Sequence, residues 1–412
     1  MKTFKELYDK LVSSALEGDF EAKTEVDYDP YQLDCLLNPN KNPLVVPTGT
    51  CNCTKEKTKE CIDRCPFGAI SESETGGIKI DPELCVGCAL CIDECESEKL
   101  TESTDIIPAL KAIRASKGPA YALVAPAFLG QFQSVVTPGM LRTALKRIGF
   151  DGMLEVALFA DILTLKEALE FDKNIRAESD YQLTSCCCPM WIAMIRKVYN
   201  DLMPHVPGSV SPMIACGRTV KLLHPDALAV FIGPCLAKKA EAREKDLAGA
   251  VDYVLTFREI QNIFDALGID PSVMDEHEKD HSSRAGRIYA RAGGVSEAVE
   301  KTLSRLSPQR PISIRTKRAD GVPECREMMN NLLQGKQDAN FYEGMGCKGG
   351  CVGGPKSVVG AVEGRRLVDA YGEKSPYQTP IENPYVIELL HRLGIDTIEG
   401  LLEDTEIFTR RF

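Results

Sequence analysis

Short apolar runs alternate with amphipathic helical stretches along most of the chain after about residue 106. Three runs have the length and composition of buried strands: 120–128, 227–234 and 251–257. Two stretches have the apolar spacing of helices: 162–175 and 257–267. This alternation predicts an α/β domain over residues 106–412, which ends in a helical segment over 383–408.

Residues 1–105 have a different sequence pattern. Residues 1–45 combine a polar amphipathic helical pattern with turns rich in proline and asparagine, and they carry no recognisable motif. Residues 46–105 hold eight cysteines and few long apolar periods, as expected of a small domain that is held together by metal. The sequence therefore predicts three parts, 1–45, 46–105 and 106–412.

Composition and charge narrow the class of protein. The chain has 412 residues, 44% apolar content and a formal net charge of -11, which is typical of a globular protein with a sizeable core. An acidic chain without a basic run is a poor partner for nucleic acid or an anionic membrane. No apolar run approaches the roughly 20 residues of a membrane span, and the N-terminus lacks the pattern of a secretion signal. We expect a cytoplasmic protein.

The seventeen cysteines are the unusual feature, because they are clustered and odd in number. Thiols in the cytoplasm stay reduced, so clustered cysteines there indicate metal or redox chemistry rather than disulfides.

Two cysteine blocks lie in residues 46–105. The second block, CVGCALCIDEC, has the C-x2-C-x2-C-x3-C spacing of bacterial ferredoxins, which hold iron–sulfur clusters. The first block has an irregular front, C-x-C-x7-C, before its CxxxCP ending. Exchange of the fourth cysteines gives two ligand sets for [4Fe–4S] clusters: Cys51, Cys53, Cys61 and Cys95, and Cys65, Cys85, Cys88 and Cys91. Two structural zinc sites are the alternative, and the spacing of the second block favours iron–sulfur.

Three further segments place cysteines next to proline, lysine or glycine: TSCCCPMW (184–191), GPCLAKKAE (233–241) and FYEGMGCKGGCVGGP (341–355). In the last one, glycines allow the backbone to approach a bulky cluster. In this order, behind two ferredoxin-type blocks, the segments resemble the three signature loops of [FeFe]-hydrogenases. The resemblance covers the chain from about residue 46 onward, and it implies an α+β ferredoxin-like domain followed by an α/β iron-hydrogenase catalytic domain with a C-terminal segment like a small subunit.

The resemblance also implies the cofactor and the roles of individual residues. The H-cluster of the family joins a [4Fe–4S] cluster to a two-iron unit with CO, cyanide and a bridging dithiolate amine. Matching the loops assigns four ligands: Cys188, Cys235, Cys347 and Cys351, with Cys351 as the bridging thiolate. Cys187 would pass protons to the amine, Lys238 would donate to a cyanide, and Met345 would pack near the two-iron unit. Lys239 is expected at the surface, and three other thiols are expected to be buried apolar side chains: Cys35, Cys216 and Cys325.

The family's proton path also has a counterpart in the sequence. Glu167 and Glu170 lie on one face of a predicted helix, and Glu167 precedes Cys187 by the family's spacing of 20 residues. This register makes Cys186 the additional cysteine, where relatives carry serine. A solvated helix face is the alternative for the two glutamates.

Several other positions depart from the family's pattern and resemble the branch called group B. At three positions where the family has a polar or thioether side chain, this chain has Ala127, Met213 and Gly233. The relay serine of the proton path falls at Pro207, and the outermost arginine falls at Asn174.

The implied function is reversible reduction of protons to H2, with a ferredoxin or similar low-potential carrier as electron partner and maturation proteins as assembly partners. The alternatives are a non-catalytic iron–sulfur assembly or scaffold protein, an H2-sensing relative, and an electron-transfer ferredoxin fused to an inert domain.

Overall fold

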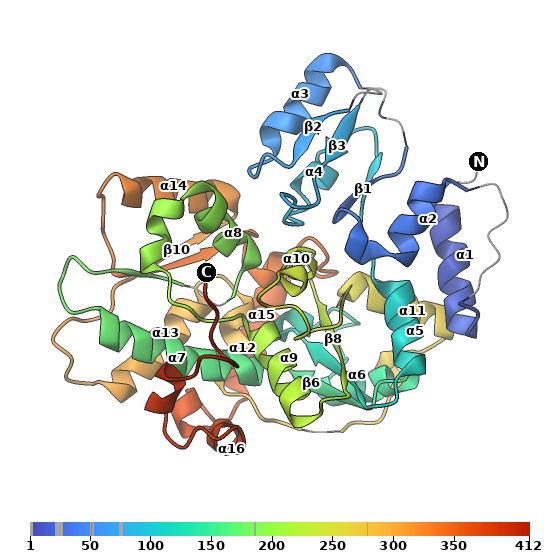
Figure 1. Ribbon diagram of the computed structural model, residues 1–412. Coiled ribbons are helices and arrows are strands. Elements are labelled where there is room, and N and C mark those ends of the chain that lie inside the picture. The colour runs from blue at the N-terminus through green and yellow to red at the C-terminus, as the bar shows by residue number, and fades with distance from the viewer. Residues whose placement is uncertain are drawn as a thin grey trace.

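The computed structural model describes residues 3–20, 28–49, 51, 53–73, 77–184, 187–277 and 279–412. Figure 1 shows a large domain of sheets and helices, a small domain that stands on it, and an N-terminal pair of helices beside both. In the described part of the chain, no helix combines the length and the apolar character that a membrane span requires.

The N-terminal segment packs on the large domain. It consists of α1 (Phe4–Glu17), α2 (Pro30–Leu37) and the short η1 (Pro39–Lys41). Thr3 and Glu6 form a capping box that starts α1. The apolar face of α1 packs against α5 (Ile106–Ala115) and α11 (Phe257–Leu267) and belongs to the main core. The described residues of this segment, 3–20 and 28–45, are therefore part of the folded unit although they carry no sequence motif.

The small domain is built from short elements with little core of its own. They are β1 (Val45–Pro47), α3 (Lys55–Arg64), β2 (Ile70–Glu72), β3 (Ile78–Ile80), α4 (Leu90–Asp93) and β4 (Leu100–Glu102). β1 pairs with β4 and β2 pairs with β3, both antiparallel. Four buried apolar side chains form its centre: Val45, Ile70, Ile80 and Leu100. Cysteines pack around this centre, so little apolar burial holds the domain together without them.

A parallel four-stranded sheet forms the middle of the large domain and confirms the predicted α/β fold. Its order is β6-β5-β8-β9, with β5 (Ala120–Val124), β6 (Gly152–Glu155), β8 (Leu228–Gly233) and β9 (Tyr253–Thr256). Such strands read as apolar runs because helices cover both faces of the sheet. These helices include α6 (Pro138–Ile148), α7 (Ala157–Asn174), α9 (Pro212–Leu223), α10 (Ala237–Arg243) and α11.

A second parallel sheet, which the sequence pattern did not reveal, carries the last glycine-rich loop. Its order is β10-β11-β7, with β7 (Gln182–Leu183), β10 (Thr316–Asp320) and β11 (Phe341–Met345). Its neighbours are α8 (Pro189–Val198), α13 (Gly294–Leu306) and α14 (Val322–Leu333). β7 leads into the segment before Cys187, and β11 leads directly to Cys347, so the sheet brings two cysteine loops to the same edge.

Short elements and the C-terminal helices complete the fold. The short elements are η2 (Pro126–Phe128), η3 (Asn200–His205), η4 (Pro271–Val273), α12 (Arg284–Arg287), η5 (Ile288–Ala290) and η6 (Cys351–Gly353). The C-terminal part contains α15 (Ala361–Glu373), η7 (Pro380–Glu382), α16 (Pro384–Arg392) and η8 (Glu399–Leu402). The prediction of helix throughout 383–408 was wrong, because Gly394 at φ +77° ends the helical path just after α16.

Candidate cluster-binding and active site

Four cysteines from three separate loops meet between the two sheets, and we call them the central cysteine site. They are Cys188 at the start of α8, Cys235 after β8, and Cys347 and Cys351 after β11. The backbone N–H of Gly346 donates to Cys188 Sγ at 3.3 Å, which ties two of these loops together.

Burial raises the pKa of three of these thiols, those of Cys235, Cys347 and Cys351. Burial, followed by the charge of Cys188, raises the pKa of Cys235 to about 11. Burial, then Cys188 and Cys235, raises the pKa of Cys351 to about 12. Four neighbouring cysteine sulfurs, all on partly buried residues, are the donor set that an iron–sulfur cluster requires, because bound metal ions stabilise thiolates outright.

Cys187 lies directly beside this site. Burial raises the pKa of its thiol well above the ordinary value, and the charges of Cys188, Glu343, Cys351 and Glu167 raise it further. The side chain is therefore a neutral thiol among acidic neighbours. The prediction for the adjacent Cys186 lies outside the described residues.

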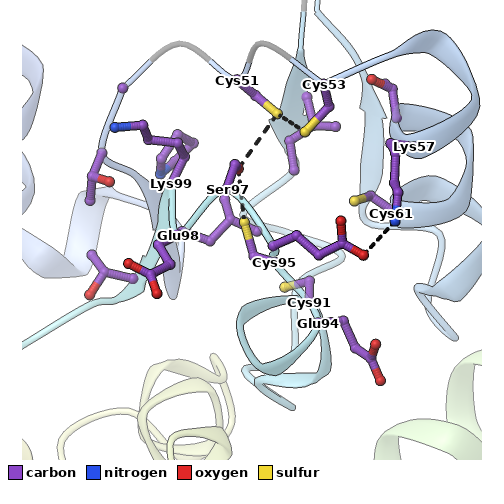
Figure 2. Close-up of a pocket in the computed structure, with 18 of the residues that line it drawn as sticks. Cys51, Cys53, Lys57, Cys61, Cys91, Glu94, Cys95, Ser97, Glu98 and Lys99 are labelled. Carbon is purple, nitrogen blue, oxygen red and sulfur yellow. Dashed lines mark hydrogen bonds and ion pairs between the residues drawn. The ribbon is translucent and has the colours of Figure 1, made fainter.

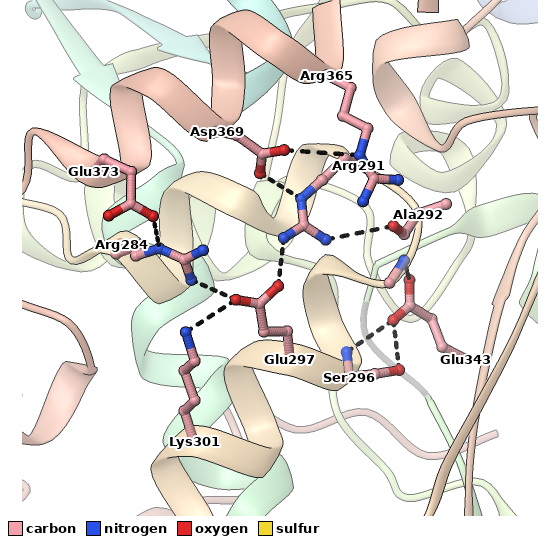
Figure 3. Close-up of polar contacts among 11 residues, drawn as sticks. Arg284, Arg291, Ala292, Ser296, Glu297, Lys301, Glu343, Arg365, Asp369 and Glu373 are labelled. Carbon is pink, nitrogen blue, oxygen red and sulfur yellow. Dashed lines mark hydrogen bonds and ion pairs between the residues drawn. The ribbon is translucent and has the colours of Figure 1, made fainter. Parts of the chain in front are cut away.

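Glu343, on β11 ahead of the third loop, is bound to the start of α13 (Figure 3), and its charge acts on Cys187. Its buried carboxylate accepts from the backbone N–H groups of Gly293 and Ser296, both at 2.7 Å, and from the Ser296 hydroxyl. A carboxylate at the N-terminus of α13 is favourable because the first N–H groups of a helix lack intrahelical partners. Sequence analysis did not single out Glu343, although it is buried two residues before Met345.

Lys238 faces the same cysteines from α10. Its Nζ lies 2.7 Å from Glu241 Oε2, and both side chains are buried. Burial alone lowers the pKa of the Lys238 ammonium, but Glu241, followed by Cys235 and Cys351, raises it, and the net direction is upward. Sequence analysis missed Glu241 as a partner, although its i,i+3 spacing from the lysine places it on the same helix face.

The prediction that Lys239 lies at the surface was wrong. Its side chain is buried, and its Nζ lies 3.3 Å from Glu259 and 3.8 Å from Asp105. These partners are distant in sequence, so local pattern could not reveal them. The other three assignments hold, because Cys35, Cys216 and Cys325 are all buried.

The glycines of the third loop permit tight packing around Met345, which is buried. A side chain at Gly350 would place its Cβ 2.7 Å from Met345 Sδ, and one at Gly344 would meet the ring of Trp191 at 2.1 Å. Gly350 also has φ +85°, a conformation that favours glycine. Glycine is also required sterically at position 233, since the ring of Phe231 occupies the space that a side chain there would need.

The two glutamates of α7 point into the protein rather than into solvent. Glu167 is fully buried and contributes to the electrostatic environment of Cys187, whereas Glu170 lies nearer the surface at 8% exposure. The Ser209 hydroxyl lies 3.2 and 3.3 Å from the carboxylate oxygens of Glu170. Counting by family spacing had assigned the serine position to Pro207, but the structure places a serine on Glu170 two residues later.

The eight cysteines of the small domain fall into two neighbouring groups. The outer cysteine site contains Cys51, Cys53, Cys61 and Cys95, which line an open cavity of about 1250 Å³ (Figure 2). The inner cysteine site contains Cys65, Cys85, Cys88 and Cys91, which line a second, smaller cavity; Cys91 also borders the first. The Ser97 hydroxyl lies 3.3 Å from Cys95 Sγ and 3.9 Å from Cys51 Sγ. Among the described residues, no three metal-binding side chains are arranged to hold a single metal ion.

The inner cysteine site adjoins the central one. Cys88 is close enough to Cys347 to contribute to the rise of its pKa, after burial and the nearer thiols. Gly87 packs so closely on the loop after Cys235 that a Cβ would lie 3.2 Å from the carbonyl carbon of Leu236. Cysteine groups therefore run in series from the open cavity to the centre of the large domain.

Comparison with known proteins agrees with this arrangement. The profile of the family described as "Iron only hydrogenase large subunit, C-terminal domain" matches residues 119–355, more than half of the chain. The NADP-reducing hydrogenase subunit HndD of Solidesulfovibrio fructosivorans is 26% identical in an alignment that covers 75% of this chain and 63% of that protein. A probable cytosolic Fe-S cluster assembly factor of Aedes aegypti is 23% identical, over 52% of this chain and 55% of that protein.

The chain thus spans less than two thirds of either relative. A solved structure of a variant of the [FeFe]-hydrogenase HydA1 from Chlamydomonas reinhardtii superposes with a TM-score of 0.62 at 22% identity. It covers 75% of this chain and 98% of that one, and at this identity it shows the shared fold. Family profile, fold and cysteine loops agree, and the chain belongs to the iron-only hydrogenase family.

Proposed function

We propose that the protein is an [FeFe]-hydrogenase that catalyses 2 H+ + 2 e- ⇌ H2. The observation that carries this proposal is the neutral, buried Cys187 thiol beside the four-cysteine site, with Glu167 behind it. A site that only held a cluster would need the four ligands, but it would not need a buried thiol connected to buried carboxyl groups.

The residues fit the H-cluster as follows. Cys188, Cys235, Cys347 and Cys351 would hold its [4Fe–4S] part, and the two-iron unit, when bound, supplies the metal centre at which protons and electrons combine. Lys238, whose ammonium is buried beside Cys235 and Cys351, would donate to an anionic cyanide ligand. Met345 would exclude water on the side of the third loop.

A proton route follows from the side chains of α7. A proton from solvent would reach Glu170, which is the more exposed glutamate, and pass to Glu167 and then to Cys187. Ser209 holds the Glu170 carboxylate in place by a hydrogen bond and is the candidate relay. The pKa of the Cys187 thiol lies above its ordinary value, so the side chain holds a proton at neutral pH and does not act as a thiolate nucleophile.

The outer and inner cysteine sites would hold two [4Fe–4S] clusters, which supply electron transfer between a carrier at the surface and the central site. The outer site borders an open cavity, and the inner site adjoins Cys347. This order supports a ferredoxin-like domain with a low-potential carrier, such as a ferredoxin, as its partner. Hydrogenase maturation proteins would supply the two-iron unit, and the cytoplasm is the proposed compartment.

Replacement of Cys187 tests the function directly. Cys187→Ala should lower H2 evolution from a reduced viologen by about 10²–10⁴-fold, because the variant lacks a positioned proton carrier. Iron content and the infrared bands of CO and cyanide should stay unchanged. Cys216→Ala is the matched control, since it removes a buried thiol outside the central site and should leave turnover intact. Full H2 evolution by Cys187→Ala would contradict the proposed role.

A non-catalytic iron–sulfur assembly protein is the second candidate, because an assembly factor is similar to this chain at 23% identity. A protein of that kind would carry [4Fe–4S] clusters without the two-iron unit. An H2-sensing member of the family would keep the full site and turn over slowly. The group B-like departures, such as Met213 and Ala127, are compatible with altered rate in either direction.

A further inference from the structure

A buried lysine sits on the proposed proton route, and the family resemblance does not account for it. Lys166 is 3% exposed, and its Nζ lies 2.7 Å from Glu170 Oε1 and 3.1 Å from Ser209 Oγ. Ser209, itself fully buried, contacts both oxygens of the same carboxylate. The three side chains form a closed polar cluster between α7 and the segment that precedes α9.

Helix stability does not explain this lysine. A lysine four residues before a glutamate is the less favourable order for an i,i+4 pair, because both charges then oppose the helix dipole. Replacement of a buried ion pair by apolar residues is often neutral or stabilising. A role in the chemistry of Glu170 is therefore the better explanation.

The position of the pair defines that role. Burial raises the pKa of Glu170 and outweighs Lys166, followed by Ser209 and the exposed Lys173, which lower it; the net direction is upward, and loss of the lysine would raise the pKa further. Glu170 is the outer of the two glutamates, and Glu167 lies on the side of Cys187. A carboxylate that kept its proton at this point would block entry of the next one.

We propose that Lys166 is a positioning residue of the proton route, which holds Glu170 ionised and fixed against Ser209 so that it accepts protons singly and releases them inward. This inference rests on the proposed hydrogenase function. In each cycle a hydronium ion in solvent gives its proton to the Glu170 carboxylate. The resulting acid then gives the proton to the Glu167 carboxylate, and Glu170 is ionised again beside an ammonium that stays charged throughout.

The test is a pair of substitutions at one position. Lys166→Met removes the charge and keeps a similar shape, whereas Lys166→Arg keeps a charge that cannot be deprotonated in a protein. Loss of an opposite charge at this distance raises a carboxyl pKa by about 1 to 3. Lys166→Met should therefore lower H2 evolution about 10- to 1000-fold, and Lys166→Arg should restore it to within about tenfold of the wild type.

An infrared measurement at neutral pH reports on Glu170 itself, in protein that lacks the two-iron unit. The difference spectrum between Lys166→Met and Lys166→Met/Glu170→Gln should contain a protonated-carboxyl band. The corresponding difference between the wild type and Glu170→Gln should not. Lys111→Met is the matched control, because this exposed lysine on α5 is not among the groups that shift the pKa of Glu170 and should leave both band and turnover unchanged. If Lys166→Met does not fold, Lys166→Gln carries the same test.

The possible results separate the explanations. An ionised Glu170 in Lys166→Met, or wild-type turnover in that variant, would overturn the proposal. If Lys166→Arg folds with full iron content and is as inactive as Lys166→Met, the lysine itself must exchange protons, which also overturns a positioning role. Absence of H2 from the matured wild type would overturn the hydrogenase function and the proton route with it, whereas the carboxyl spectra would still decide whether Lys166 sets the protonation of Glu170.

Discussion

The buried ion pair of Lys238 and Glu241 permits a quantitative prediction that separates stability from function. The two side chains are 8% and 5% exposed, and their charged atoms lie 2.7 Å apart. Removal of one partner leaves a buried charge without compensation, which costs about 3–5 kcal/mol. Lys238→Met should therefore lower the unfolding free energy by about this amount. For a domain of roughly 300 residues, with an unfolding entropy of about 0.6 kcal/mol/K, the melting temperature should fall by roughly 5–8 °C.

The double variant Lys238→Met/Glu241→Gln should recover most of this loss, because it leaves no buried charge. It should not recover H2 evolution, because the cation beside Cys235 and Cys351 is absent in both variants. The assay is anaerobic thermal unfolding of protein that carries only its [4Fe–4S] clusters, followed by turnover after maturation.

A matched control is Arg366→Gln. It breaks an exposed i,i+3 ion pair with Glu363 and should leave the melting temperature unchanged. Equal melting temperatures of the wild type and Lys238→Met would refute the energetic argument, and H2 evolution by the double variant would refute the functional one.

Three further predictions follow from other contacts. Ser209→Ala should lower H2 evolution roughly 10- to 100-fold in a viologen assay, the equivalent of the 1.5–3 kcal/mol of a hydrogen bond to a charged group; unchanged turnover would exclude Ser209 from the route. Ser97→Ala should shift one [4Fe–4S] potential to more negative values in an electron paramagnetic resonance titration, because the Cys95 sulfur loses a hydrogen bond; identical potentials would argue against that contact. Leu11→Ala should lower the unfolding free energy by about 2–5 kcal/mol in thermal unfolding, because Leu11 anchors α1 in the main core; wild-type stability would mean that α1 docks weakly.

Local signals in the sequence were enough for much of the fold. The prediction of helix over 257–267 matches α11, because Thr256 and Glu259 form a capping box and the apolar spacing is regular. The three apolar runs contain β5, β8 and β9 of the central sheet, because strands of a covered parallel sheet are apolar on both faces; the end of the run 120–128 forms η2 instead. β7 has only two residues, too few for a period-two pattern, so the second sheet could not be predicted.

The geometry of the site depends on contacts between residues that are far apart in the sequence, and a local sequence pattern does not reveal such contacts. The central cysteines could be matched because their loops keep recognisable spacing. The prediction for Lys239 failed because its partners, Asp105 and Glu259, come from remote parts of the chain. Counting by family spacing placed the relay serine at Pro207 because it assumes constant loop length; in the structure Ser209 is the serine that contacts Glu170. The sequence also did not predict the buried ion pair of Lys166 and Glu170, since an i,i+4 spacing does not show whether a pair is buried.

The central claim is that the four central cysteines carry a hydrogen-forming two-iron centre. Infrared spectroscopy of the purified protein after maturation, with a hydrogenase of known activity matured in parallel, tests it most directly. We expect CO and cyanide stretching bands together with H2 evolution from a reduced viologen. Iron sufficient only for [4Fe–4S] clusters, with no CO or cyanide bands while the parallel hydrogenase is fully matured, would contradict it.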